Sequence, residues 1–218
     1  MSDDKHWLEA PKWWKKVKPL RWLAIGGIIF IIVSATYTAK VLIAPGHHEE
    51  TEKFTQRTAA PVPFLDGIQS YDTVDSVKSR LDAAKAQSTL TSRHLPPSSK
   101  YPPRERDTLV AHYPHLGVDG QLTLEFFNDR LYEAEFVPAE PGAYVEKLHA
   151  AEPRLKRERS GRAEITAGNL RIASNVDFAV TEVGRNLQTK AYVIWQDLPL
   201  LALLDEWDRR FVAAPQKK

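Results

Sequence analysis

The chain has 218 residues, of which 43% are hydrophobic and 27% charged, and a formal net charge of +2. These proportions are typical of a folded globular protein and exclude wholesale disorder, while the near-neutral charge argues against a nucleic-acid partner, which selects a strongly basic face. The chain contains no cysteine, which excludes disulfides, thiolate metal sites and cysteine nucleophiles.

The N-terminal part of the chain has the pattern of a membrane anchor. Residues 1–21 are basic, and Lys40 is the one charged residue in the apolar stretch 22–44. About 20 residues of helix cross the hydrocarbon core of a bilayer, so we expect a single transmembrane helix at 22–44. The basic flank predicts a cytoplasmic N-terminus. We therefore expect an inner-membrane protein of a bacterium, with its C-terminal domain in the periplasm or otherwise outside the cytoplasm.

Aromatic and basic side chains at both ends of this stretch fit the two membrane–water interfaces. Trp and Tyr are enriched at such interfaces, and the long stem of a lysine reaches the headgroups. The expected membrane-interface residues are Trp13, Trp14, Trp22, Tyr37 and Lys40. Membrane lipid is therefore a predicted partner.

A cleaved signal peptide is the alternative interpretation. The small residues Val33-Ser34-Ala35 follow an apolar segment, which fits the cleavage pattern and places the cut after Ala35. However, apolar residues resume at Val41-Leu42-Ile43, and residues 1–21 carry three tryptophans. The pattern favours an uncleaved anchor.

Residues 45–64 mix charges, threonines and prolines without periodicity, so we expect a flexible tether there. One folded domain is then predicted at 65–214, followed by a short tail at 215–218. This division leaves the domain to fold on its apolar core alone, because the chain has no cysteine.

The first half of the predicted domain contains a helix and then strands. Apolar residues recur at steps of three and four, as in one face of a helix, at Val74, Val77, Leu81 and Ala84; Asp72 or Thr73 can cap it. Residues 91–106 hold four prolines and predict a loop, or an exposed extended segment whose proline pairs dock a partner. Alternation over 107–138, with turns at Asp119-Gly120 and Asn128-Asp129, predicts a three-stranded antiparallel meander.

The second half repeats this order. A helix is predicted from residue 141, with Pro153 ending or bending it. Three strands are predicted at 163–175, 177–184 and 187–197, with Gly184-Arg185-Asn186 as the last turn. A final helix, capped by Asp197, presents Leu200, Leu204, Trp207 and Phe211 on one face. The predicted fold class is α+β, with an antiparallel sheet and helices packed on one of its faces.

Part of the domain resembles a known family. "GIQSYDTVDSVKSRL", then a proline-rich loop, then "GQLTLEFFNDRLYEAEF" together look like the small BamE-type bacterial envelope domain over residues 65–137. There a helix at a glycine-led motif precedes a meander with an aromatic hairpin. The resemblance implies a protein-binding envelope module without catalytic residues. The chain departs from the family in lacking the cysteine through which such lipoproteins are commonly anchored.

Few residues point to chemistry. His112 and His115 face opposite sides of a strand, so surface histidines are expected rather than a metal site. Glu125, Glu133 and Glu135 put carboxylates on neighbouring strands, as acid–base catalysis requires, but solvent-facing side chains are the simpler interpretation. No catalytic, cofactor-binding or metal-binding residue is assigned.

One basic run is a candidate contact for an anionic partner. It consists of Arg154, Lys156, Arg157, Arg159 and Arg162. Such a cluster can meet phosphates, an anionic polymer or an acidic protein, although nearby glutamates also fit a solvated helix end.

These patterns lead to three hypotheses for function. The first is a non-enzymatic, membrane-anchored, extracytoplasmic module that binds other proteins of a bacterial cell-envelope complex. The alternative is a binding domain for an anionic envelope polymer or lipid. The second alternative is an enzyme whose site is not recognisable from sequence.

Overall fold

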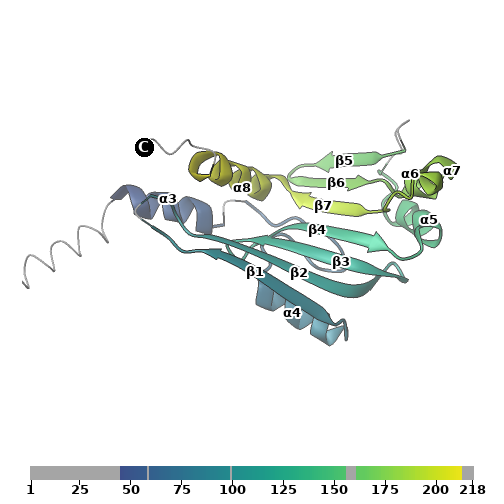
Figure 1. Ribbon diagram of the computed structural model, residues 1–218, viewed down its shortest axis with the longest axis horizontal. Helices are drawn as coiled ribbons and strands as arrows, with labels where there is room; N and C mark the ends of the chain where they lie inside the picture. Colours follow the sequence, from purple (N-terminus) through teal and green to yellow (C-terminus); the bar gives the residue numbers. More distant parts are fainter. Residues whose placement is uncertain (1–44, 58, 99, 156–160, 213–218) are drawn as a thin grey trace, which may run out of the picture. The chain divides into compact units, whose positions relative to one another are not determined.

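The computed structural model describes residues 45–57, 59–98, 100–155 and 161–212 (Figure 1). Several predictions lie outside these residues: the basic segment 1–21, the span 22–44 with the interface residues Trp13, Trp14, Trp22, Tyr37 and Lys40, the cut after Ala35, and the tail 215–218. Among the described residues, no helix has both the length and the apolar character that crossing a membrane requires.

Seven strands in the described part of the chain form one sheet, in the order β1-β2-β3-β4-β7-β6-β5. The strands are β1 Ser88–Leu95, β2 Arg104–His115, β3 Val118–Phe127, β4 Leu131–Pro138, β5 Ala163–Ala167, β6 Leu170–Ser174 and β7 Val193–Asp197. All neighbouring pairs are antiparallel. The predicted α+β class with an antiparallel sheet is therefore confirmed.

The described helices are α3 Pro45–Thr55, α4 Val74–Ala83, α5 Pro141–Ala151, α6 Val176–Val180, α7 Glu182–Asn186 and α8 Leu198–Phe211. Two predicted caps are confirmed. The Thr73 hydroxyl accepts a hydrogen bond from the amide of Ser76 at the start of α4, and the Asp197 carboxylate accepts one from the amide of Leu200 at the start of α8. Each cap satisfies an amide that the first turn leaves without a helical partner.

The main hydrophobic core lies between one face of the sheet and helices α4, α5 and α6. Its sheet side includes the fully buried Leu109, Leu122, Leu124 and Phe136, and its helix side includes Val77, Leu81, Tyr144, Leu148 and Val176. The alternation of buried residues along β3 and β4 is the period of two that the sequence shows. This core buries one face of the sheet under the three helices.

A second, smaller core lies on the other face of the sheet, where α3 and α8 cover one end (Figure 1). Phe126 belongs to the main core, and the next residue, Phe127, packs with Phe54 and Trp207 in the second. Consecutive strand residues point to opposite faces, so the two cores lie back to back. The prediction that helices pack on one face is therefore wrong, because the sheet end at Phe127 is apolar on both sides.

The predicted tether is also wrong for the residues that the structure describes. Residues 45–55 form α3, and Phe54 is 0% exposed. The turn between β3 and β4 holds the end of this helix: Asn128 Nδ2 donates to the carbonyl of Phe54 at 2.9 Å, and Arg130 donates to the carbonyls of Phe54 and Gln56. The segment is mostly polar, so its composition gave no sign that the packing of α3 depends on one buried aromatic residue, Phe54. The compact unit accordingly begins at Glu49 rather than at residue 65.

Two turn predictions need correction. The β2–β3 turn lies at Leu116-Gly117, where both residues have positive φ (52° and 66°), as a two-residue hairpin turn requires. Asp119-Gly120, the predicted turn, lies within β3, where a Cβ on Gly120 would come within 2.5 Å of Phe136. Gly120 therefore serves close packing rather than a turn. Asn128-Asp129, also at positive φ, is a turn as predicted.

Two secondary-structure predictions also need correction. Residues 88–95 form strand β1, so the exposed extended segment, and not the loop, describes residues 91–95. The strand lacks the usual alternation because seven of its eight residues are exposed. Residues 177–184, a predicted strand, are helical in α6 and α7. Gly184 allows these two short helices to approach, since a Cβ there would meet the carbonyl of Phe178.

Candidate functional site

The sheet face opposite the main core, which we call the polar face, carries one polar residue from each strand in a single cross-strand row. The paired positions, from β1 to β5, are Thr91, Thr108, Glu125, Glu133, Gln196, Arg171 and Thr166. Their sequence neighbours, such as Leu109, Leu124 and Trp195, are buried in the main core. The row is therefore positioned by the same alternation that builds the core.

Hydrogen bonds connect the β4, β7, β6 and β5 side of the row. Arg171 makes a bidentate contact with Glu164, at 2.8 and 3.0 Å, and also donates to the Gln196 side chain at 2.8 Å. The Gln196 amide in turn donates to Glu133 at 2.6 Å. Bidentate arginine–carboxylate contacts fix geometry as well as charge, so this half of the polar face is held by its own side chains.

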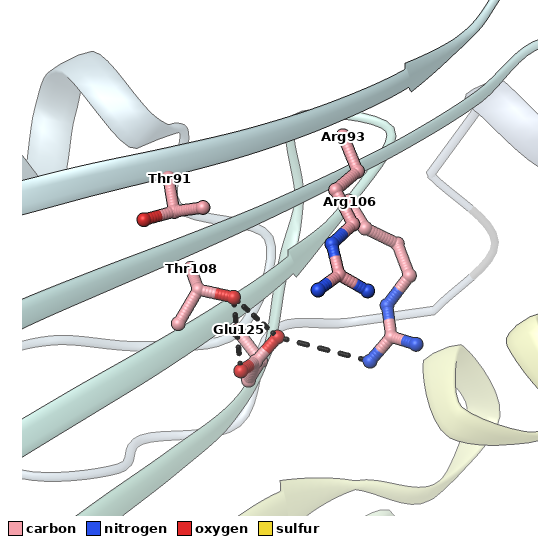
Figure 2. Close-up of a pocket in the computed structure, with 5 residues that line it drawn as sticks. All are labelled: Thr91, Arg93, Arg106, Thr108 and Glu125. Atoms are coloured by element: carbon pink, nitrogen blue, oxygen red, sulfur yellow. Dashed lines mark hydrogen bonds and ion pairs between the residues drawn. The ribbon is translucent and has the colours of Figure 1, made fainter.

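The other half of the row borders a pocket of about 300 Å³, lined by Thr91, Arg93, Arg106, Thr108 and Glu125 (Figure 2). The Thr108 hydroxyl lies 3.1 Å from both oxygens of Glu125. Arg106 lies 3.8 Å from Glu125 and donates to the Tyr132 hydroxyl at 3.3 Å. Burial raises the pKa of Tyr132 to about 12, so its hydroxyl is neutral at physiological pH.

Two guanidinium groups meet at this pocket. Arg93 of β1 lies directly opposite Arg106 of β2 in the strand register, and like charges in that position repel. Glu125 approaches Arg106, whereas the side chain of Arg93 has no hydrogen bond or ion pair among the described residues (Figure 2). The pocket can therefore take one further negatively charged group, with threonine hydroxyls beside it as additional donors.

Three carboxylates lie together in the middle of the polar face. Glu125 and Glu133 are directly opposite, and Glu135 is two residues further along β4. Burial raises the pKa of Glu133, and the charges of Glu125 and Glu135 raise it further, while the hydrogen bond from Gln196 lowers it. These residues are half-buried rather than simply solvent-facing as predicted. A carboxyl group of raised pKa can exchange a proton, but it can also simply hold Gln196.

His115 differs from its prediction as a surface histidine. It is 6% exposed, and its Nδ1 lies 2.9 Å from Asp66. Its ring contacts those of Phe136, Tyr144 and Trp195 at centroid distances of 5.4 to 5.9 Å. The hydrogen bond between His115 and Asp66 holds the loop that carries Asp66 against the sheet. Within the described ranges, no group of three or more His, Cys, Asp or Glu side chains could hold a metal ion.

The predicted basic run is not assembled into one site by the described residues. Arg154 pairs with Glu152 at 3.3 Å, and Arg162 is an exposed residue with an interaction of its own. Lys156, Arg157 and Arg159 lie outside the described residues. The arginines that the fold does bring together are Arg93 and Arg106. Sequence reasoning missed them because the proline-rich segment separates them and the strand β1 was not predicted.

Comparisons with protein-family models, with curated proteins and with solved structures give no match for this chain. The resemblance of residues 65–137 to the BamE-type domain stays a prediction.

Proposed function

We propose that this protein is a non-enzymatic, membrane-anchored, extracytoplasmic module that binds other proteins of a bacterial cell-envelope complex. The observation that supports it best is the polar face. One side of the sheet is buried under α4, α5 and α6, while the other, beyond the end under α3 and α8, presents a row of ordered polar side chains. A broad, ordered surface of this kind suits a macromolecular partner.

The shape and lining of the pockets favour a protein surface over a small-molecule site. Small-molecule pockets are mostly apolar and enclose their ligand. The pocket at Arg93 and Arg106 is lined by polar and charged side chains, and a second one, at the β2–β3 turn, by residues that include Asp119 and Lys147. Side chains that are already hydrogen-bonded lose less freedom when a partner binds.

The predicted anchor at 22–44 gives this binding surface its context. Tethering a domain to the bilayer raises its effective concentration toward other membrane proteins. Such a module needs no catalytic group. Because the predicted anchor would hold the domain at the membrane, we propose that its partners are proteins of the cell envelope.

A single substitution on the polar face tests this function. Thr123 on β3 is half-buried on that face, between Gln121 and Glu125, and Thr123→Arg adds a bulky cation there without touching the core. Crosslinking in intact cells, followed by mass spectrometry, should show partners that are lost with Thr123→Arg. The matched control is Ser79→Arg, which adds the same cation at an exposed position of α4, on the main-core side of the sheet and outside both pockets, and it should retain them. A protein that co-purifies with nothing, and whose purified form turns over a substrate pool, contradicts the proposal.

The guanidinium pair supports a second candidate, a binding domain for an anionic envelope polymer or lipid. Arg93 and Arg106 then replace the basic run at 154–162 as the expected contact. Binding of vesicles rich in phosphatidylglycerol should fall steeply as salt rises from low to physiological concentration, and it should fall further in Arg93→Glu. Protein partners that persist at physiological salt favour the first candidate.

A further inference from the structure

Strand β1 forms an open edge of the sheet. It lies at one end of the strand order, pairs with β2 over its whole eight-residue length, and seven of its eight residues are exposed. The opposite edge, β5, has five residues. Among the described residues, no strand pairs with the outer side of β1 (Figure 1).

The backbone of β1 offers hydrogen bonds along this outer side. In an antiparallel pair, every second residue directs its N–H and C=O away from the paired strand. An edge of this length is a template for an added strand, and several protein families bind extended peptides in this way. Backbone pairing would supply affinity, and the side chains of β1 would supply selectivity.

The side chains of β1 differ on its two sides. Leu90 lies opposite Leu109 on the side of the main core and is 42% exposed. Thr91 and Arg93 lie on the polar face and line the pocket (Figure 2). An added strand would therefore place an apolar residue beside Leu90 and a polar residue beside Arg93, three positions away and on the opposite side.

The charge at Arg93 specifies the polar residue. Arg93 faces the cation Arg106 and has no ion pair among the described residues, while Glu125 serves Arg106 and Thr108. A carboxylate on the added strand next to Arg93 would neutralise this charge, whereas a lysine there would increase the repulsion.

We infer that β1 binds an extended segment of a partner protein as an added strand, with an acidic residue beside Arg93 and an apolar residue beside Leu90. This inference rests on the proposed protein-binding function and names its site. A second copy of the chain fits less well, because β1 itself, STLTSRHL, contains no carboxylate. Two such edges would bring a second Arg93 rather than a counter-charge.

Binding of a synthetic peptide to the full chain in detergent tests the inference. The probe is a fluorescent eight-residue peptide, matching β1 in length, in which glutamate alternates with valine. We expect saturable binding by fluorescence anisotropy. The same peptide with alternate backbone amides N-methylated cannot pair as a strand and should not bind. The lysine-for-glutamate version should not bind either.

Two variants assign the site. Arg93→Glu should weaken binding of the glutamate peptide by about tenfold or more, the change expected when about 1.4 kcal/mol is lost, and should restore binding of the lysine peptide. Arg209→Glu, at an exposed position of α8, is the matched control and should leave both results unchanged. Because Arg93 is exposed, its replacement should not unfold the domain, which circular dichroism checks.

Each other outcome overturns the inference. Binding that survives N-methylation is charge attraction without strand pairing. Binding that is unaffected by Arg93→Glu lies elsewhere. A dimer that forms with rising concentration, is blocked by the glutamate peptide and is lost in Arg93→Glu would make the occupant a second copy.

Photocrosslinking in cells separates this inference from the proposed function. A crosslinker at Ser92 on β1 and another at Thr123 on the polar face report on the two surfaces. Crosslinks to envelope proteins from Thr123 but none from Ser92 would remove the edge-strand site and keep the protein-binding function. No crosslinks from either position would contradict both.

Discussion

On the polar face, the ionised form of Glu133 is destabilised by its surroundings. Because burial and two neighbouring carboxylates raise its pKa, the folded protein holds this proton more tightly than the unfolded chain does. Glu133 therefore contributes a penalty to stability that is absent below its unfolded-state pKa and grows as the pH rises through the folded-state value.

Replacing Glu133 by glutamine should accordingly stabilise the protein at neutral pH, by about 0.5 kcal/mol, the scale of a like-charged cross-strand pair. A glutamine oxygen can still accept the hydrogen bond from Gln196. The advantage should shrink as the pH falls and vanish in acid, where wild-type Glu133 is protonated. Urea unfolding at several pH values measures this. The control is Glu146→Gln at an exposed position inside α5, and a stabilisation that persists unchanged in acid would argue against the charge explanation.

Arg130 is the buried residue that fixes the end of α3. It is 6% exposed and donates to the carbonyls of Phe54, Gln56 and Phe127. Burial lowers its pKa, although an arginine side chain stays protonated in proteins. Arg130→Ala leaves these carbonyls without a charged donor and should cost about 2–3 kcal/mol of unfolding free energy. Arg209→Ala, at an exposed position in α8, is the control.

At the scale of elements, α3 belongs to the folded domain. A fragment that begins at residue 45 should melt cooperatively, whereas one that begins at residue 65 lacks Phe54 and Phe64, both buried. Loss of a buried phenylalanine costs about 3–5 kcal/mol. We therefore expect the shorter fragment to melt far lower or to be molten, and Phe54→Ala in the longer fragment to reproduce much of the loss. Equal melting temperatures for the two fragments would contradict this role.

Elements with a strong local signal were predicted well from sequence. α4 and α8 combine a cap residue with an apolar stripe, and β3 and β4 alternate clearly, so local physics alone specifies them. β1 and α3 were missed because nothing local marks them. β1 is a strand only through its pairing with β2, and α3 is held by the distant residues Asn128 and Arg130.

The candidate site was predicted in part. The three glutamates were recognised from alternation along β3 and β4, since alternation also determines which residues share a face. The pairing of Arg93 with Arg106 depends on the register across a loop that contains four prolines. The register of two strands joined by such a loop is set by how the whole sheet packs, so it cannot be read from neighbouring residues in the sequence.

At the scale of the whole molecule, two hydrophobic cores share one sheet. Phe126 and Phe127 are adjacent in β3 and belong to different cores. Unfolding of β3 would therefore expose apolar side chains of both cores at once. α8 follows β7 directly, which links the strand carrying Trp195 in the main core to the helix carrying Trp207 in the second. This arrangement predicts a single cooperative unit rather than two independently melting layers.

The two tryptophans of residues 45–218 report on the two cores separately. The four other tryptophans precede residue 45, so a fragment that begins there retains only Trp195 in the main core and Trp207 in the second. In Trp207→Phe, fluorescence follows the main core, and in Trp195→Phe, it follows the second. Within each variant, the fluorescence transition in urea should coincide with the transition measured by far-ultraviolet circular dichroism. If the Trp207 signal changes at a lower urea concentration than the dichroism of the same variant, α3 and α8 detach before the sheet unfolds, and the single-unit prediction is wrong.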